Sequence, residues 1–420
     1  MGRLKPISAL PFAFWGALRA IQLALFGWGQ GPDPNLYAWY VGLWKHGGVF
    51  PYLDYALEYP PGALLFFRLP TILGDAPIAD APEVYGSLFG VQMLLVDLGC
   101  LALIHLGYRA SGDRARVASY VYSLLTALMF PVLFTRFDLV TSLFVLIACI
   151  SLLRYRSGFS AGLAIGLAGA IKLWPFGLVP IFAGYCLFAL SRRAAMRYLG
   201  GVALAGLLPF LFFAFRAHWG VLDFLTYHSD RGIQFASFWA TLALAGEYSG
   251  LTDIGLVSNY GSWHLSGGWA DVMSALSPLV LVVLGLVPQG LVLFRRRLRT
   301  DPDTFLLAVF ASVVGIMLGS NVYSAQFVLW IIPCGMLCFR QWRSPALLLA
   351  LIAGTTTLFF PYSRAWSWPP TLMPGLQAYA PHPALLVAGI RNLCTGLLYV
   401  LLLIRIVRQC REDEDSRSPA

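Results

Sequence analysis

The sequence predicts an all-α polytopic membrane protein with about twelve transmembrane helices and two large outer loops that carry interfacial helices. The first observation is composition: the 420 residues are 58% hydrophobic and only 12% charged, whereas soluble domains carry about 25% charged residues. The second is that apolar runs recur along the chain at roughly 20 residues, the length that crosses a bilayer. The third is that the basic residues gather in alternate connections between these runs.

The apolar runs locate the expected helices, with boundaries accurate to ~4 residues. The first run has no small-residue cleavage site after a short apolar core, so we interpret it as a retained helix and not as a cleaved signal peptide. No repeat of fixed period is found, which argues against a solenoid. The sequence predicts helices near residues 9–28, 85–108, 116–134, 138–153, 158–172, 174–190, 198–216, 270–294, 304–320, 324–339, 345–361 and 384–407.

Twenty of the 29 Lys and Arg residues fall on one side of the membrane if these helices alternate. The positive-inside rule makes that side cytoplasmic. We therefore expect a multi-pass protein of the cell (plasma) membrane with both termini in the cytoplasm, and we interpret the formal charge of +9 as topological and not as a nucleic-acid signal. The basic set is Arg3, Lys5, Arg109, Arg114, Arg116, Arg154, Arg156, Arg192, Arg193, Arg197, Arg295, Arg296, Arg297, Arg299, Arg340, Arg343, Arg405, Arg408, Arg411 and Arg417.

This topology predicts one integral-membrane domain over residues 1–408 and a short cytoplasmic tail over 409–420. The large outer loops lie at about 29–84 and 217–269. Six of the seven cysteines sit within apolar runs and one in the tail, so no disulfide framework is expected. The sequence shows no phosphate-loop motif and no metal-ligand spacing. We expect no metal and no cofactor.

The first outer loop, residues 31–68, is the most informative stretch of the chain. Asp33, Asp54 and Glu58 stand there among many Tyr, Trp and Phe residues. Acidic groups framed by aromatic rings beside a bilayer suit a site that handles polyhydroxyl substrates. The loop is therefore expected to hold the active site, on the outer side of the membrane.

Two interpretations of Asp33 stay open. Asp33 followed by Pro34 is typical of an N-cap and first helical position, with Gly47 and Gly48 closing the helix. The carboxylate also suits a general base. Asp54 and Glu58 are four residues apart and are expected to point the same way on a helix or a strand; they form either a solvated loop edge, ion pairs with arginines, or part of the site.

Polar residues also gather at the outer ends of the other expected helices. Arg136 and Asp138 flank Phe137, where Asp138 suits a helix start. Lys172, His228, Arg231 and Arg364 are cations expected on the outer side. They are interpreted either as partners of lipid headgroups or salt bridges, or as a phosphate clamp for a lipid-linked phosphate ester. Inside the apolar runs, Arg19 and Asp97 are expected to form a structural interhelical pair. The candidate site residues outside the first loop, besides Arg136 and Asp138, are Lys172, His228, Arg231, Gln326 and Arg364.

Five stretches together resemble glycosyltransferase family 87. They are residues 33–37, GVFPYLDYALEYPPG at 48–62, TRFDL at 135–139, AIKLWPF at 170–176 and YHSDRGIQFAS at 227–237. The resemblance covers roughly residues 30–330. It implies the polytopic GT-C fold and an inverting transfer of mannose from a polyprenyl-phosphate donor. The chain departs from the family pattern at Ala236, where an acidic residue is expected.

The resemblance also implies roles for particular residues. Asp33 matches the general base of the first loop, and Lys172, His228 and Arg231 match positions near the donor phosphate. The expected partners are a polyprenyl-phosphate sugar, a glycolipid or glycan acceptor and membrane lipids, with no nucleic acid.

The leading hypothesis is therefore an enzyme, a polyprenyl-phosphate-sugar-dependent hexosyltransferase. Two alternatives stay open: a transporter or flippase of lipid-linked sugars, and a non-catalytic subunit that binds them. A transporter places its polar groups near the bilayer midplane on broken helices. Here they concentrate at outer helix ends, which favours the enzyme.

Overall fold

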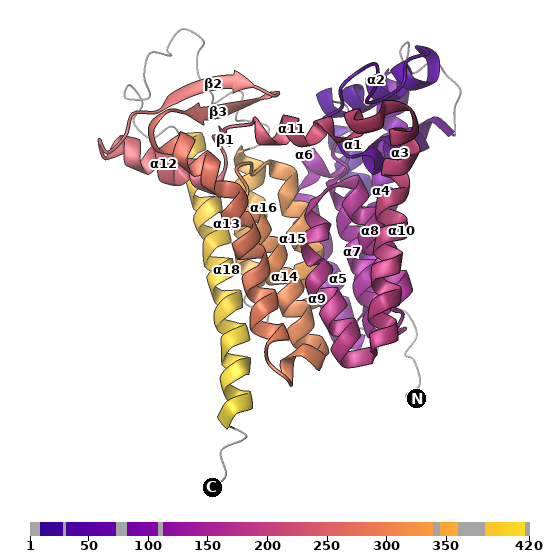
Figure 1. Ribbon diagram of the computed structural model, residues 1–420, viewed down its shortest axis with the longest axis vertical. Helices are drawn as coiled ribbons and strands as arrows, with labels where there is room; N and C mark the ends of the chain where they lie inside the picture. The colour runs from indigo at the N-terminus through magenta and orange to yellow at the C-terminus, as the bar shows by residue number, and fades with distance from the viewer. Residues whose placement is uncertain are drawn as a thin grey trace.

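A computed structural model describes residues 9–27, 31–72, 82–107, 112–338, 345–359 and 383–415. The described chain is predominantly helical. Long helices run side by side, and short helices and a small sheet gather at one end of them (Figure 1). The long helix α18 extends from that end to the opposite one. We call these the loop end and the opposite end.

Among the described residues, five helices are long and apolar enough to cross a membrane, judged by length and composition. Six shorter apolar segments coincide with other expected helices, and one forms part of the first loop. The five are α4 (Pro82–Gly107), α10 (Arg192–Ala217), α13 (Gly268–Leu293), α14 (Pro302–Gly319) and α18 (Pro383–Asp415). The shorter segments are α1 (Leu10–Phe26), α3 with η1 (Pro61–Arg68, Leu69–Ile72), α7 (Asp138–Leu153), α8 (Gly158–Ile171), η3 with α9 and η4 (Trp174–Leu178, Val179–Tyr185, Cys186–Leu190), η7 with α15 (Ala325–Phe327, Val328–Cys338) and α16 (Pro345–Phe359).

The helix expected over 116–134 is shorter and interrupted. Helix α5 (Gly112–Leu128) ends before Met129, and one further turn, α6 (Phe130–Leu133), follows it. Pro131 lies in that turn, and a proline cannot donate the backbone hydrogen bond that would continue a helix. The interruption leaves the segment that leads to Asp138 free to turn toward the first loop.

The first large loop contains the expected helix, although this helix starts earlier than predicted. Helix α2 spans Pro32–His46, with Pro32 as its first residue, Gly31 as N-cap and Gly47 as C-cap. The N-cap interpretation of Asp33 is therefore wrong, because Asp33 is the second residue of the helix. Pro32 precedes Asp33 and also suits the first helical position, which is why the boundary was placed two residues late.

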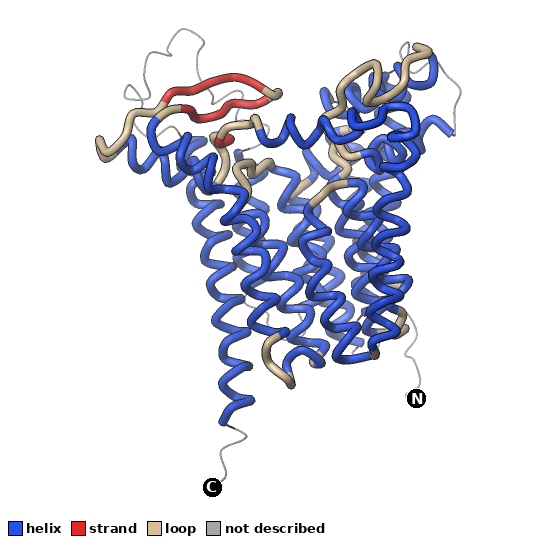
Figure 2. Tube along the Cα trace, in the orientation of Figure 1, coloured by secondary structure: helices blue, strands red, loops and turns tan. Residues whose placement is uncertain are grey.

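The large loop at about residues 217–269, called the fourth loop below, holds short helices, as expected, and also a sheet that the sequence does not predict. Figure 2 shows the strands at the loop end. Strand order is β1-β3-β2, and both pairings are antiparallel. The elements are η5 (His218–Leu222), α11 (Asp223–Ser229), β1 (Ile233–Gln234), α12 (Phe238–Tyr248), β2 (Gly255–Asn259) and β3 (Ser262–Ser266).

Helices α8 and α10 approach so closely that only glycine fits between them. A Cβ added at Gly158 or Gly162 would lie 2.4 Å from Ala194 O or 2.1 Å from Tyr198 O, respectively. Small residues are what allow helix backbones to approach this closely in membrane proteins. The contact fixes the register of the two helices and brings their first turns together.

The expected pair between Arg19 and Asp97 is confirmed, at 2.8 Å between Arg19 Nε and Asp97 Oδ2. Trp15 Nε1 donates to the same carboxylate oxygen at 2.5 Å, and Tyr122 Oη donates to Asp97 Oδ1 at 2.7 Å. Arg19 Nη2 donates to Thr126 Oγ1 at 2.5 Å. These bonds satisfy a charge pair buried between α1, α4 and α5, and thereby fix how the three helices pack.

This network gives a stability prediction. Asp97→Ala leaves the Arg19 guanidinium buried without its counter-charge, a change that costs about 3–5 kcal/mol in buried pairs. We expect a clearly lower melting temperature for the purified protein in detergent. Asp113→Ala is the matched control, because Asp113 pairs with Arg116 at an exposed site and exposed pairs contribute only about 0–1 kcal/mol. Equal melting temperatures for both variants would contradict a structural role for Asp97.

Candidate active site

Two ion pairs flank Phe137 at the loop end of the bundle. Arg136 Nη1 lies 2.7 Å from Asp33 Oδ1, and Lys172 Nζ lies 2.6 Å from Asp138 Oδ1. The first pair connects the segment before α7 to α2. The second connects the first residue of α7 to the residue that follows α8. Residues from three distant stretches of chain therefore meet around one aromatic ring.

Lys172 is enclosed by its counter-ion and by aromatic rings. Its Nζ lies 5.2 Å from the ring centroids of Phe137, Phe327 and Trp330. Trp330 Nε1 donates to Asp138 Oδ1 at 2.8 Å, so the carboxylate oxygen accepts from both Lys172 and Trp330. This arrangement bears out the salt-bridge interpretation of Lys172, and it fixes the ammonium group in place.

Tyr37 packs among aromatic rings close to the two ion pairs. Its ring stacks on Phe67 with centroids 4.1 Å apart, and it meets Phe137 and Tyr59 edge-on at 5.7 and 6.0 Å. Burial raises the pKa of the Tyr37 hydroxyl well above its ordinary value, with Asp33 adding to the rise and Arg136 opposing it. Tyr37 is therefore a neutral hydrogen-bond donor at physiological pH.

Three buried polar atoms around Phe137 have no hydrogen-bond partner among the described residues. They are Tyr37 Oη, Arg136 Nε and Asp138 Oδ2. Buried polar groups are normally hydrogen-bonded, and each exception needs an explanation. A hydroxyl donor, a guanidinium donor and a carboxylate acceptor together are the groups that bind the hydroxyls of a sugar.

Asp54 and Glu58 lie on neither a helix nor a strand, contrary to the expectation. Asp54 is exposed, and its Oδ2 accepts from the backbone N–H of Phe50 at 2.5 Å. Asp54 lies in a turn at residues 52–54, where the φ of 64° at Tyr52 is in the left-handed region. Residues 56–60 after this turn belong to no helix or strand, so the regular spacing that would align the two carboxylates does not apply. Asp54 stabilises the loop, whereas Glu58 is half-buried and faces the site.

Glu58 connects the first loop to the fourth. Burial raises the pKa of the Tyr227 hydroxyl above its ordinary value, and the charge of Glu58 with a hydrogen bond to it raises it further. Glu58 also acts electrostatically on Lys172 and Tyr37. The turn after Glu58 is fixed against α8, because a Cβ at Gly62 would lie 2.6 Å from Ala170 O.

Arg231 lies where the fourth loop meets the connection between α14 and α15. Its Nη2 donates to Ser262 Oγ at 2.9 Å, its guanidinium lies 5.7 Å from the Tyr227 ring centroid, and its carbonyl accepts from Asn321 Nδ2 at 2.9 Å. Among the described side chains Arg231 has no carboxylate partner, and its buried Nε has no hydrogen-bond partner. It is thus the cation of this cluster best able to accept an anionic ligand.

The remaining predicted residues have different outcomes. Gln326 is buried in η7, next to Phe327 of the Lys172 enclosure. The side chain of His228 and the whole of Arg364 lie outside the described part of the structure. In the described ranges no group of three or more His, Cys, Asp or Glu side chains is arranged to hold a metal ion.

Sequence reasoning missed several residues that build the site. Trp330 donates a hydrogen bond to Asp138, which also pairs with Lys172, and the Tyr37 ring packs against Phe137. Gln234 Oε1 accepts from the backbone N–H of Tyr323 at 2.9 Å, which fixes the fourth loop to the α14–α15 connection. The only sequence signal was that polar and aromatic residues sit at helix ends. That signal does not say which of them meet.

The sheet supplies a pH-dependent group, His264. Its side chain is buried, its Nε2 lies 3.2 Å from Ser262 Oγ, and its Nδ1 has no partner among the described residues. Burial and the nearby Arg231 lower the pKa of His264 from 6.5 to about 4.

We therefore expect the sheet to lose stability as the pH falls from 6.5 to about 4, because the unfolded chain binds a proton over this range and the folded chain does not. Hydrogen exchange of residues 255–266 at pH 7 and pH 5 measures this loss. His264→Gln removes the titrating group, so its protection should change less between the two pH values. An identical pH response in wild type and His264→Gln would contradict the assignment.

The model of glycosyltransferase family 87 matches residues 57–324. No curated protein matches the chain. The matched range includes Glu58, Arg136, Asp138, Lys172 and Arg231 and excludes Asp33. Because it covers more than half of the 420 residues, and because apolar helices and a polar loop-end cluster accompany it, the chain is a membrane protein that belongs to glycosyltransferase family 87.

Proposed function

We propose that this glycosyltransferase moves a sugar, mannose, from a polyprenyl-phosphate donor to a lipid-linked or cell-envelope glycan acceptor, with inversion at the anomeric carbon. The observation that carries the proposal is the pair of ion pairs around Phe137, with unpartnered polar atoms between them. Such a site offers a carboxylate, fixed cations and the hydroxyl of a buried tyrosine, Tyr37. These are the groups that the transfer needs.

Asp33 is the proposed general base. Its carboxylate stays 17% exposed although it pairs with Arg136, so an acceptor hydroxyl can reach it. The position in the first turn of α2 places it on a rigid element. Asp33 takes the proton of the acceptor hydroxyl, whose oxygen attacks the anomeric carbon, and the bond from that carbon to the donor phosphate breaks.

The leaving phosphate departs with the electron pair, so cations are needed and no general acid is required. Arg231 suits this role best, because no described carboxylate neutralises it. Lys172 already pairs with Asp138. It therefore supports the phosphate at longer range and orients the Asp138 carboxylate toward the sugar. His228 and Arg364 are proposed as further phosphate contacts.

The sugar itself is proposed to lie between Glu58, Tyr37 and Asp138. Asp138 Oδ2 and Tyr37 Oη are buried and unpartnered, so each is able to bind a sugar hydroxyl. Gln326 is proposed as a nearby amide contact, and Asp54 as the residue that holds the loop in shape.

The direct test uses purified protein, radiolabelled polyprenyl-phosphate mannose or glucose, and a membrane lipid extract. Label from the mannose donor should enter a glycolipid, and label from the glucose donor should not. Transfer from the glucose donor alone would reject mannose but keep the lipid-phosphate donor. No transfer from either donor would reject the lipid-phosphate donor.

Asp33→Asn tests the base. The substitution removes basicity but keeps size and polarity, so we expect about 10²-fold or greater loss of turnover with donor binding retained. Asp54→Asn is the matched control, because this acidic residue lies in the same loop outside the cluster, and its turnover should stay near wild type. Wild-type turnover in Asp33→Asn would show that Asp33 is not the base, and Glu58 or Asp138 would then be the candidate.

Arg231→Gln tests the phosphate contact. Losing a charged hydrogen bond costs about 1.5–3 kcal/mol, so donor affinity should fall roughly 10- to 100-fold while acceptor affinity changes little. Arg216→Gln is the control, because Arg216 is exposed at the same end and stacks on Phe50 away from the cluster. Equal donor affinity in both variants would remove Arg231 from the site.

The proposed sidedness places the loop end outside the cell and both termini inside. A cysteine introduced by Lys45→Cys should react with an impermeant thiol reagent added to intact cells. One introduced by Arg297→Cys should react only after the cells are opened. The native cysteines of the described helices are buried or half-buried, and replacement of Cys410 by Ser removes the tail thiol. The reverse labelling pattern would refute an outward-facing site.

A further inference from the structure

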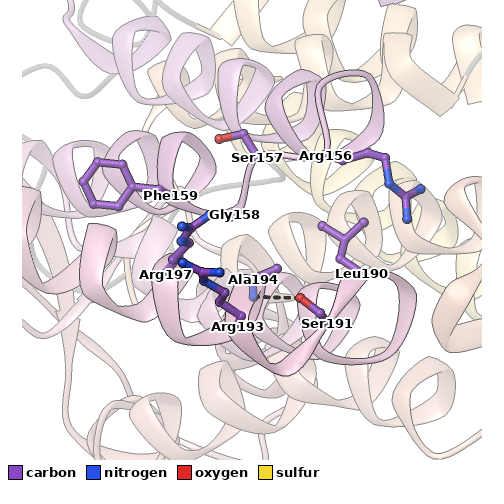
Figure 3. A pocket seen from close by; sticks show the side chains of 9 residues that line it. All are labelled: Arg156, Ser157, Gly158, Phe159, Leu190, Ser191, Arg193, Ala194 and Arg197. Atoms are coloured by element: carbon purple, nitrogen blue, oxygen red, sulfur yellow. Dashed lines mark hydrogen bonds between the residues drawn. The ribbon is translucent and has the colours of Figure 1, made fainter.

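A hollow of about 300 Å³ lies between the first turns of α8 and α10. Figure 3 shows the side chains that line it, drawn from the connection between α7 and α8 and from the start of α10. Most of the lining is polar or cationic, and Phe159 and Leu190 are its large apolar residues. The polar lining comprises Arg156, Ser157, Ser191, Arg193 and Arg197.

The hollow is remote from the candidate active site. Helix α7 begins at Asp138, a residue of that site, and its 16 residues span about 24 Å before the chain reaches Arg156. The hollow therefore lies at the opposite end of the bundle and takes no part in binding the sugar donor.

The close packing of α8 against α10 brings two helix N-termini to the hollow. Ser157 and Ser191 are the N-caps, and their hydroxyls accept from Ser160 N and Ala194 N at 3.3 and 3.1 Å. Each helix start carries a partial positive charge from its aligned peptide dipoles and its remaining N–H groups. Since Gly158 allows the two backbones to touch, both partial charges face the same space.

Three arginines add full positive charges to these dipoles, and no acidic residue of the described chain lines the hollow. Arg193 and Arg197 are four residues apart on α10, where like charges repel, and neither has a carboxylate partner among the described side chains. Figure 3 shows both on the side of α10 that faces Gly158. An anion bound between them would relieve this repulsion.

Arg156 belongs to the connection between α7 and α8, which forms another part of the lining. Its Nη2 donates to Ala189 O at 3.2 Å, which holds the side chain across the connection between η4 and α10. Its φ of 52° lies in the left-handed region, where glycine is less costly and an arginine is uncommon. An arginine thus occupies a position whose backbone conformation glycine adopts more readily.

We propose that this hollow binds a phosphate group, either from the headgroup of an anionic phospholipid or as free phosphate. Guanidinium groups form bidentate hydrogen bonds with phosphate oxygens. Helix N-termini supply further N–H donors to the same anion. Basic pockets between membrane helices are known to take lipid head groups, and the exposed outer surface of α10 leaves room for acyl chains beside it.

The test measures the melting temperature of the purified full chain in a zwitterionic detergent during titration with two probes. One is dihexanoyl phosphatidic acid and the other is inorganic phosphate, with dihexanoyl phosphatidylcholine and sodium sulfate as reference additives. We expect saturable stabilisation by phosphatidic acid or by phosphate. A response to phosphatidic acid alone identifies a lipid headgroup, whereas a response to both identifies the phosphate group itself as sufficient.

The double variant Arg193→Gln/Arg197→Gln should weaken the apparent affinity for the responding probe by at least tenfold, because it removes two charged contacts. The matched control is Arg192→Gln/Arg296→Gln, which removes two exposed positive charges outside the hollow and should keep wild-type affinity. Arg193→Lys/Arg197→Lys keeps the charge and should retain part of the response. No saturable response in wild type, or equal losses in the Gln double variant and its control, would overturn the proposal.

Discussion

Arg136 and Asp138 extend from either side of Phe137 to two different parts of the chain, and the loop end of the molecule depends on these two contacts. Arg136 reaches α2 through Asp33, and Asp138 reaches the end of α8 through Lys172. A buried charge without a partner is costly, whereas a paired and hydrogen-bonded one is tolerated. The two pairs therefore fix the first loop and α8 relative to the start of α7 at the same time.

The aromatic residues complete this arrangement by burying the Asp138 carboxylate and enclosing much of the Lys172 side chain. Phe137, Phe327 and Trp330 surround the Lys172 ammonium, and Tyr37 and Phe67 lie beneath Phe137. Electrostatic interactions strengthen in such a low-dielectric setting. The same enclosure leaves a few polar atoms unpaired, and these give the site its capacity to bind a polar ligand. Rigidity and binding capacity thus come from the same set of contacts.

Close helix packing carries this order toward the opposite end of the bundle. Gly62 allows the first loop to rest on the end of α8, and Gly158 and Gly162 allow α8 to rest on α10. Because α8 connects both contacts, the position of Lys172 at one end and the meeting of two helix starts at the other depend on the same helix. The proposed phosphate-binding hollow is a direct consequence of this packing.

The sequence alone determined the class of the molecule, the places of the apolar helices, the family and the pairing of Arg19 with Asp97. These properties follow from local composition, from hydropathy over about 20 residues and from the cost of a lone charge among apolar side chains. The class, the helices and the family do not depend on which distant segments meet, and the Arg19–Asp97 pair is expected because few charged residues lie inside the apolar runs. Most of the candidate residues were likewise found as polar groups at helix ends.

Only the tertiary structure decided which of those residues are partners. Asp33 is a helix residue that binds Arg136, not an N-cap, and Asp54 holds a turn while Glu58 faces the site. The three-stranded sheet of the fourth loop was also invisible in the sequence, because β1 and β3 pair across some 30 residues. Ion pairs and strand pairings between distant segments depend on how helices pack in three dimensions, and residue spacing along the chain carries no information about that.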